Sequence, residues 1–146
     1  MIASKASTTS SGHGAGDEVL VAFCRLATAH LRANDLFARI GGEEFAILLP
    51  DTTRQDALWL AERIRAAVET ASHTVGDHAI RATVSAGVAL SNDATADLAG
   101  LLKAADQTLY RAKEAGRNRV EISSLADESP LLGRPDCSSI HKRSAA

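Results

Sequence analysis

The sequence predicts an α/β (α+β) domain in which helices cover a mainly antiparallel sheet. Three observations support this prediction. Apolar residues recur at three- and four-residue steps in three segments, which is the spacing of one buried helix face. Short apolar runs between these segments have the composition of strands. The segments follow one another as helix, hairpin, helix, strand, helix and strand, an order that suits helices packed on a sheet.

Length and composition restrict the class of protein. With 146 residues, 45% of them hydrophobic, the chain is large enough for one domain with a sizeable core. A formal net charge of -2 gives no reason to expect a nucleic acid polymer as partner. No apolar run approaches the roughly 18 residues of a membrane span, and the Ser/Thr-rich start lacks the apolar core of a signal peptide. We therefore expect no membrane segment in this chain and a cytoplasmic location.

The chain divides into three parts. Residues 1–11 have almost no large apolar side chains and neither helical nor strand periodicity, so we expect a flexible leader. Residues 12–122 carry the periodic segments and form the domain. Residues 123–146 hold several serines and two of the three prolines, which predicts a disordered tail.

The first helix follows a glycine-rich segment that starts at Gly12. Asp17 falls near its first turn, where a carboxylate complements the free N–H groups and the helix dipole. Apolar residues from Val19 onward keep a helical spacing, so this helix is expected to run to about Ala33.

A hairpin is expected next, with the run Gly41-Gly42-Glu43-Glu44 between two apolar strands. Adjacent glycines supply the positive φ that two-residue turns require, and they let a ligand approach the backbone closely. The two carboxylates suit a divalent cation carrying a nucleotide triphosphate, because Mg2+ takes oxygen ligands from carboxylates and phosphates. An ordinary hairpin with a solvated glutamate pair is the alternative.

The second half of the chain predicts two more helices and two strands. A helix is expected from about Arg54 to Ala71, with Trp59 beside its buried stripe as a partly buried packing residue rather than a cofactor platform. Small residues within the strand Ile80–Leu90 indicate a tightly packed central strand. The third helix begins within residues 93–97 and ends before Gly116, a suitable C-terminal cap, and a short strand follows.

Several motifs resemble one known family. The run Arg39-Ile40-Gly41-Gly42-Glu43-Glu44-Phe45 resembles the signature of the GGDEF family, the diguanylate cyclases, in its Glu-containing form. Further segments resemble the same family in the family's order and extend the resemblance over roughly residues 12–122. They are Gly12-His13-x-x-Gly16-Asp17, Arg32-x-x-Asp35, Ser85-x-Gly87-Val88-Ala89, and Ala105-Asp106-x-x-Leu109-Tyr110-x-Ala112-Lys113 followed by Gly116-Arg117-Asn118-Arg119.

The resemblance implies a fold and a reaction. The fold is a ferredoxin-like nucleotidyl-cyclase palm. The reaction condenses two GTP molecules, one on each domain of a homodimer, to cyclic di-GMP and two pyrophosphates. Glu43 would be the ligand of Mg2+ (or Mn2+) and a catalytic residue, with Glu44 as its catalytic partner.

The same resemblance assigns the substrate contacts. Gly41 and Gly42 would lie against the substrate, and Asp17 would contact guanine. Lys113 and Arg117 would hold the triphosphate, and two cations four residues apart on a helix share a face and can neutralise a polyphosphate. A solvated basic helix end is the alternative.

A regulatory site is also implied. In the family, an Arg-x-x-Asp at this spacing from the glycine pair marks an inhibitory site for cyclic di-GMP, which assigns the site to Arg32 and Asp35. A surface ion pair is the alternative. Arg63 is a further candidate contact, which we do not expect to be decisive.

One part of the family pattern is missing. The family's first strand ends in Asp-x-Asp-x-Phe-Lys-x-Ile-Asn-Asp, whose first Asp is the second metal ligand, and this chain has no such motif. Reading the bases for residues 1–12 two positions later allows a matching motif, so we interpret the chain as an N-terminally truncated or frameshifted member. We expect a sheet lacking that strand and impaired cyclase activity.

Two other interpretations remain open. The chain is a non-catalytic regulatory module that binds GTP or cyclic di-GMP through Arg32 and Asp35, or it is a fragment that folds poorly.

Overall fold

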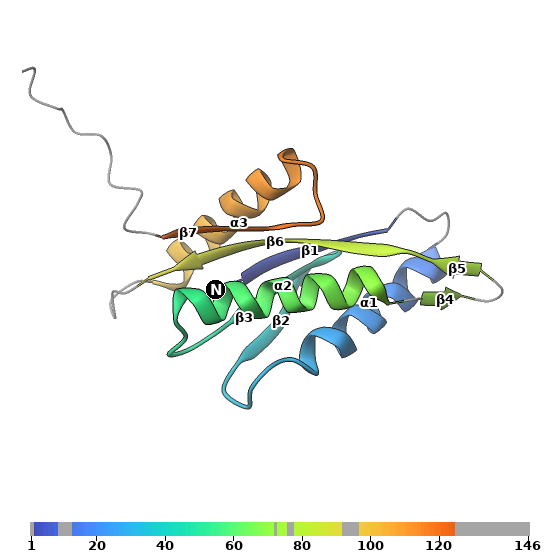
Figure 1. The fold of residues 1–146 in the computed structure, drawn as a ribbon, viewed down its shortest axis with the longest axis horizontal. Coiled ribbons are helices and arrows are strands. Elements are labelled where there is room, and N and C mark those ends of the chain that lie inside the picture. The colour runs from blue at the N-terminus through green and yellow to red at the C-terminus, as the bar shows by residue number, and fades with distance from the viewer. Residues whose placement is uncertain (1, 9–12, 72, 76–77, 92–96, 125–146) are drawn as a thin grey trace, which may run out of the picture.

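The structure is a computed structural model that describes residues 2–8, 13–71, 73–75, 78–91 and 97–124 (Figure 1). Within this part of the chain, no helix has the length and apolar character needed to cross a membrane. The elements in chain order are β1 (Ile2–Thr8), α1 (His13–Thr28), β2 (Leu36–Gly41), β3 (Glu44–Leu48), α2 (Arg54–Thr70), β4 (His73–Val75), β5 (His78–Ile80), β6 (Ala82–Leu90), α3 (Leu98–Glu114) and β7 (Val120–Ser124).

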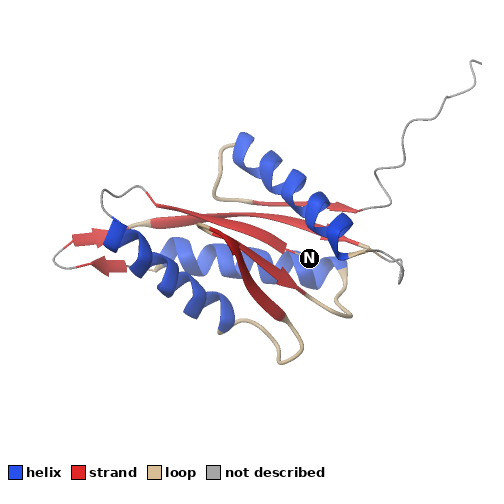
Figure 2. Ribbon diagram, turned by 180° about the vertical axis from the view of Figure 1, so that it is seen from behind, coloured by secondary structure: helices blue, strands red, loops and turns tan. Residues whose placement is uncertain are grey.

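A five-stranded sheet with the order β2-β3-β1-β6-β7 forms the middle layer. The pairs β2–β3, β3–β1 and β1–β6 are antiparallel and the β6–β7 pair is parallel. Figures 1 and 2 show α1 and α2 on one face of this sheet and α3 on the other. The predicted α+β fold with a mainly antiparallel sheet is therefore confirmed.

Strand β6 connects the two halves of the core. Val84 and Val88 face the large cluster formed with α1 and α2, whereas Ala89 belongs to the smaller cluster under α3. Gly87 explains how closely α3 approaches: a Cβ at this position would lie 2.2 Å from the Leu109 amide nitrogen. The predicted tight packing of this strand is therefore confirmed, and β6 lies inside the sheet between β1 and β7.

Strand β1 corrects the expectation of a flexible leader, which is wrong for residues 2–8. Ile2 pairs with Ile47 of β3 and with Val88 of β6, so β1 lies between these two strands. A ladder needs only backbone N–H and C=O groups, which allows a segment without an apolar pattern to occupy this place. The strand expected to be missing thus has a counterpart in the sheet.

The other boundaries differ less. Ser123 and Ser124, expected in the tail, end β7, and residues 125–146 lie outside the described residues. Helix α1 ends at Thr28 rather than near Ala33. The hydroxyl of Thr28 donates to the Cys24 carbonyl at 2.8 Å, and the His30 amide bonds to the Ala27 carbonyl three residues back, which tightens the last turn.

The three phenylalanines of the chain anchor the hairpin to α1. The ring of Phe45 on β3 stacks on that of Phe37 on β2, with centroids 5.5 Å apart. Phe23 of α1 packs against Phe45 at 4.9 Å. Aromatic pairs at such distances add to the hydrophobic burial, so the strands of the hairpin have a fixed base.

Candidate functional site

The hairpin ends in a two-residue connection. Gly41 pairs with Glu44, which leaves Gly42 and Glu43 as the turn, and the register shifts between Arg39 and Gly41. The Nε–H of Arg39 donates to the Gly42 carbonyl at 2.7 Å. The Arg39 guanidinium also lies 5.9 Å from the centre of the Phe45 ring. The Arg39 side chain therefore connects the turn to the strands of its own hairpin.

The glycines at this tip have a different role from the one expected. Among the described glycines, Gly116 has a positive φ, whereas Gly41 and Gly42 do not, so the expectation of positive φ at the turn is wrong. A Cβ at Gly42 would meet nothing within 4 Å, and one at Gly41 would meet Glu44 Oε2 at 3.8 Å. Among the described residues, neither backbone conformation nor packing therefore requires glycine at these two positions.

The two carboxylates of the tip are half-buried. Glu44 lines a pocket of about 370 Å³ between the hairpin and α3, together with Ile40, Lys103 and Asp106. Glu44 thus lies on the face of the sheet that α3 covers. Across the described residues, no three or more His, Cys, Asp or Glu side chains gather as a possible metal site.

The second group of candidate residues lies where α3 turns into β7. Helix α3 ends at Glu114, so Arg117 does not share its face with Lys113 as the spacing suggested. The chain instead doubles back, and the Arg117 amide donates to the Ala112 carbonyl at 3.1 Å. Gly116, Arg117 and Asn118 all have positive φ, of 113°, 60° and 45°. The predicted glycine cap is confirmed, and two further left-handed residues follow it.

A hydrogen-bond network holds this left-handed turn. The side-chain amide of Asn118 donates to Glu69 at 2.7 Å and accepts from Arg65 at 3.0 Å. The backbone amide of Asn118 donates to the Ser85 hydroxyl at 3.1 Å. Arg65 is itself paired with Glu69 and with Glu62, both at 2.7 Å. The hydrogen bonds from Arg65 and then Asn118 lower the pKa of Glu69, so this carboxylate is ionised at neutral pH.

Both groups of residues lie at one end of the sheet. Lys5 of β1 is the register partner of Glu44 on β3 and of Ser85 on β6. The Ala86 amide on β6 donates to the Arg119 carbonyl at 2.9 Å, which extends this row to the chain entering β7. Glu44 and Arg119 are thus about 14 Å apart, three interstrand spacings of roughly 4.8 Å. The hairpin tip and the turn with Arg117 can face one extended ligand.

Asp17 lies near the same end. Strand β1 runs toward the hairpin tip, and α1 starts at His13, after β1 ends. The first turns of α1 therefore lie near this end of the sheet. Asp17 is exposed in the second turn, because the helix begins earlier than the sequence suggested. The structure brings these predicted residues to one end of the sheet, and among the described residues Asp17 makes no hydrogen bond or ion pair with the other groups.

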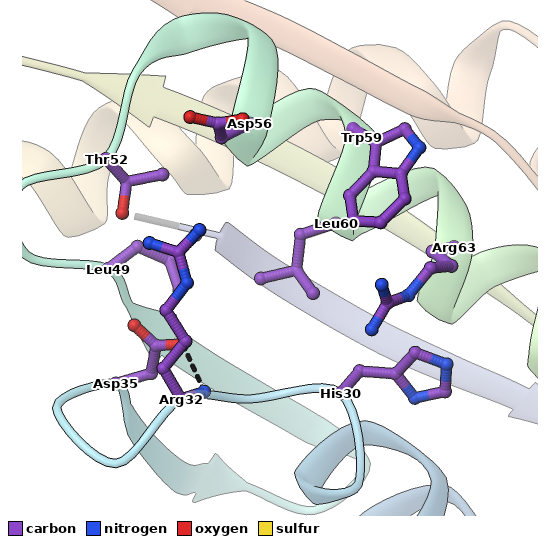
Figure 3. A pocket seen from close by; sticks show the side chains of 9 residues that line it. All are labelled: His30, Arg32, Asp35, Leu49, Thr52, Asp56, Trp59, Leu60 and Arg63. Atoms are coloured by element: carbon purple, nitrogen blue, oxygen red, sulfur yellow. Dashed lines mark hydrogen bonds between the residues drawn. The ribbon is translucent and has the colours of Figure 1, made fainter.

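A second pocket, of about 290 Å³, lies between the loop after α1 and helix α2 (Figure 3). Arg32 and Asp35 line it together with Arg63 of α2. The Asp35 carboxylate accepts from the Arg32 backbone amide at 2.7 Å. Within the described residues, Arg32 and Asp35 form no ion pair, which removes the surface ion pair as an explanation of the motif.

Two other residues at this pocket were not expected. Trp59 was expected to be partly buried, but 59% of it is exposed because Leu60 and Ile64 take the buried face of α2. The Arg63 guanidinium lies over the Trp59 ring, 4.5 Å from its centroid. His30 also lines the pocket, and its Nδ1–H donates to the Leu26 carbonyl at 2.7 Å. No sequence pattern singled out His30.

The network around Asn118 was also missed by the sequence analysis. Its local part was visible, because Arg65 and Glu69 are four residues apart on a predicted helix. Its long-range part was not, because Asn118 lies 49 positions from Glu69 and 53 from Arg65.

Comparison with known proteins gives consistent matches. A family model described as "Diguanylate cyclase, GGDEF domain" matches residues 5–119. Response regulator PleD of Caulobacter vibrioides is 44% identical over 111 residues, which cover 75% of this chain and 24% of PleD. Diguanylate cyclase DgcM of Escherichia coli is 47% identical over 109 residues, 75% of this chain and 26% of DgcM. The chain spans about a quarter of the length of these curated relatives.

Solved structures show the same fold. The active GGEEF domain of a diguanylate cyclase from Vibrio cholerae superposes with a TM-score of 0.70 at 31% identity, covering 83% of this chain and 81% of that one. The GGDEF domain of PA1120 from Pseudomonas aeruginosa superposes with a TM-score of 0.74 at 33% identity, covering 86% of this chain and 78% of that one.

Proposed function

Because the chain belongs to the GGDEF family of diguanylate cyclases, we propose that it binds GTP at the end of the sheet where the hairpin tip and the α3–β7 turn lie. Two such domains would then face each other in a homodimer and condense two GTP molecules to cyclic di-GMP and two pyrophosphates. Each domain would supply one half-site. Reactions of this kind depend mainly on positioning and on neutralising phosphate charge.

The observation that carries this proposal is the open backbone at Gly41 and Gly42. Both positions have room for a Cβ and neither has a positive φ, so their lack of side chains is useful only to something that approaches from outside. A phosphate group fits this description, since it can accept hydrogen bonds from exposed backbone amides.

Lys113 and Arg117 would neutralise the triphosphate. Arg117 is exposed and Lys113 is half-buried, and within the described residues neither makes an ion pair that would compete for its charge. Arg117 is presented by a turn whose left-handed backbone is fixed from α2 and β6. Asp17 would accept hydrogen bonds from guanine, with its exposed carboxylate at the start of α1.

The carboxylates of the tip fit a metal ion shared with the substrate. Mg2+ (or Mn2+) is commonly held by one or two carboxylates together with phosphate oxygens rather than by an all-protein cage. Glu43 would be the ligand and Glu44 its partner, with both carboxylates half-buried at the hairpin tip. The ion would supply charge neutralisation at the phosphates.

Turnover is expected to be impaired. By the family resemblance, β1 would be the strand that carries the second metal ligand, but its sequence Ile-Ala-Ser-Lys-Ala-Ser-Thr contains no carboxylate. The sheet therefore has a strand in this place without the second acidic ligand. One carboxylate fewer at a phosphoryl-transfer site removes electrostatic stabilisation of the transition state.

Calorimetry with GTP and Mg2+ tests the site. We expect binding, with a loss of about tenfold or more in affinity for Lys113→Ala and for Arg117→Ala. Arg111→Ala is the matched control, because it removes the same charge from the last turn of α3 at a residue that contacts Thr108 instead. Equal losses in all three variants would show a general charge effect and no site. Chromatography of the same mixture measures cyclic di-GMP, and turnover at ordinary rates would contradict the expected impairment.

A second candidate function is supported by the pocket at Arg32. We infer that this pocket takes cyclic di-GMP as a regulatory ligand, because it combines Arg32 and Asp35 of the loop after α1 with Arg63 and Asp56 of α2. Calorimetry with cyclic di-GMP tests it, and Arg32→Ala should abolish the binding. Binding of cyclic di-GMP without any turnover of GTP would favour the non-catalytic module over the enzyme.

A further inference from the structure

Trp59 is the least explained large side chain of the second pocket. It is exposed although neighbouring apolar residues of α2 are buried, so it does not contribute to the core. An exposed tryptophan on a helix face offers a large aromatic ring with which a ligand can make contact. Trp59 lies at the rim of the pocket that Arg32 and Asp35 line.

Arg63 completes the surface around Trp59. Its guanidinium lies 4.5 Å from the indole centroid, one helical turn after Trp59. This cation–π contact orients the guanidinium, and within the described residues Arg63 makes no ion pair, so its N–H groups remain for a ligand. An aromatic face beside a free fork of donors suits a ligand that joins a planar base to a phosphate.

The opposite wall has complementary chemistry. In Figure 3 the Arg32 side chain rises from the loop on one side of Leu60, and Trp59 and Arg63 lie on the other. The Asp35 carboxylate is held in place by the Arg32 backbone amide. A carboxylate can accept from the adjacent N1–H and N2–H groups of guanine, whereas adenine has the acceptor N1 beside its single amino donor group.

We propose that Trp59 stacks on a guanine base of a cyclic dinucleotide in this pocket and thereby contributes to affinity. The inference rests on the proposed regulatory site at Arg32 and adds a recognition residue on α2. Stacking of a base on an aromatic side chain corresponds to about tenfold to hundredfold in affinity.

The tryptophan itself reports the contact, because it is the chain's single tryptophan. Titration with cyclic di-GMP should change the Trp59 fluorescence, with the same midpoint as calorimetric binding. GTP, which we expect to bind at the hairpin tip and the α3–β7 turn, should leave the Trp59 fluorescence unchanged. Trp59→Leu should weaken cyclic di-GMP binding about tenfold or more, Trp59→Phe should retain most of it, and both should leave GTP binding unaltered.

The outcomes separate this inference from the site on which it rests. Calorimetric binding that Arg32→Ala abolishes, with no fluorescence change and an unaltered Trp59→Leu variant, would overturn the stacking role and leave the regulatory site standing. No binding of cyclic di-GMP to the unmodified chain would overturn both. Thermal melting of each variant checks that it is folded, and the exposure of Trp59 makes loss of the fold an unexpected result.

Discussion

The hairpin tip and the α3–β7 turn lie at the same end of the sheet and are built in opposite ways. Gly42 and Glu43 are held by their own strands and by Arg39 three residues away, and the space around the glycines is open. The turn at Arg117 is left-handed and is fastened by residues from α2 and β6. A local hairpin needs no distant support, whereas successive left-handed residues cost free energy that long-range contacts must offset.

Gly87 and Gly42 also differ in the space around them. Gly87 has the α3 backbone within van der Waals distance, while Gly42 has free space. The packing of α3 on the sheet requires Gly87, whereas no packing contact requires Gly42. Substitutions at Gly87 and Gly42 therefore test this difference most directly.

The largest effect is expected for Gly87→Ala. The new Cβ would lie 2.2 Å from the Leu109 nitrogen and 2.3 Å from the Ala105 oxygen, both backbone atoms of α3. The helix must move away, and we expect a loss of about 3 kcal/mol or more in the free energy of unfolding. Urea denaturation measures it. A loss below about 1 kcal/mol would show that α3 shifts easily and that Gly87 does not set its position.

Asn118→Ala is expected to cost less, about 2 kcal/mol. The change removes the hydrogen bonds to Arg65 and Glu69 and places alanine at a φ of 45°. Asn118→Gly is the matched control, because glycine accepts this φ and loses only the side-chain bonds. Denaturation of both variants separates the two contributions. Equal stability of the alanine and glycine variants would contradict a strained backbone at this turn.

Gly42→Ala should leave the free energy of unfolding within about 0.5 kcal/mol, because the added methyl meets no protein atom. GTP affinity should nevertheless fall, by roughly tenfold, since the methyl occupies the space by which a phosphate reaches the backbone. Calorimetry against the unmodified chain measures this. Unchanged GTP affinity would show that the hairpin is an ordinary turn without a role in GTP binding.

The smallest effect concerns pH. The folded-state pKa of Glu69 is lowered by its hydrogen bonds to Arg65 and then Asn118, so its contribution is present above the ordinary pKa of 4.5 and is lost as pH falls through the lower folded value. The stability gap between the chain and Glu69→Gln should therefore narrow in acid. Thermal melting from neutral pH to below pH 4.5 tests this. A gap that persists or widens in acid would exclude a role for the charge.

Much of the fold followed from local patterns. The helices, the hairpin and the tight strand around Gly87 were predictable because periodicity and small residues act over a few positions. The helix ends were less predictable, since the turn after Thr28 depends on individual hydrogen bonds. The phase of α2 placed Trp59 off the buried stripe, and only packing decided that it stays exposed.

The candidate site also has a part that the sequence predicted and a part that it did not. Family motifs made Glu43, Lys113 and Arg117 candidates from the sequence. The structure brings the hairpin tip and the α3–β7 turn to one end of the sheet through the shared register of β3, β1 and β6. The support of Arg117 was not predictable, because its hydrogen bonds join segments about 50 positions apart.

The sequence by itself determined the order of elements, the glycine and carboxylate tip, and the membership of the GGDEF family. Only the tertiary structure decided that residues 2–8 form the central strand, because their side chains carry no pattern and the neighbouring strands supply the reason to pair. It also decided that Gly41 and Gly42 have space around them and no positive φ. Local propensity acts through neighbours in the chain, whereas these features arise from neighbours in space.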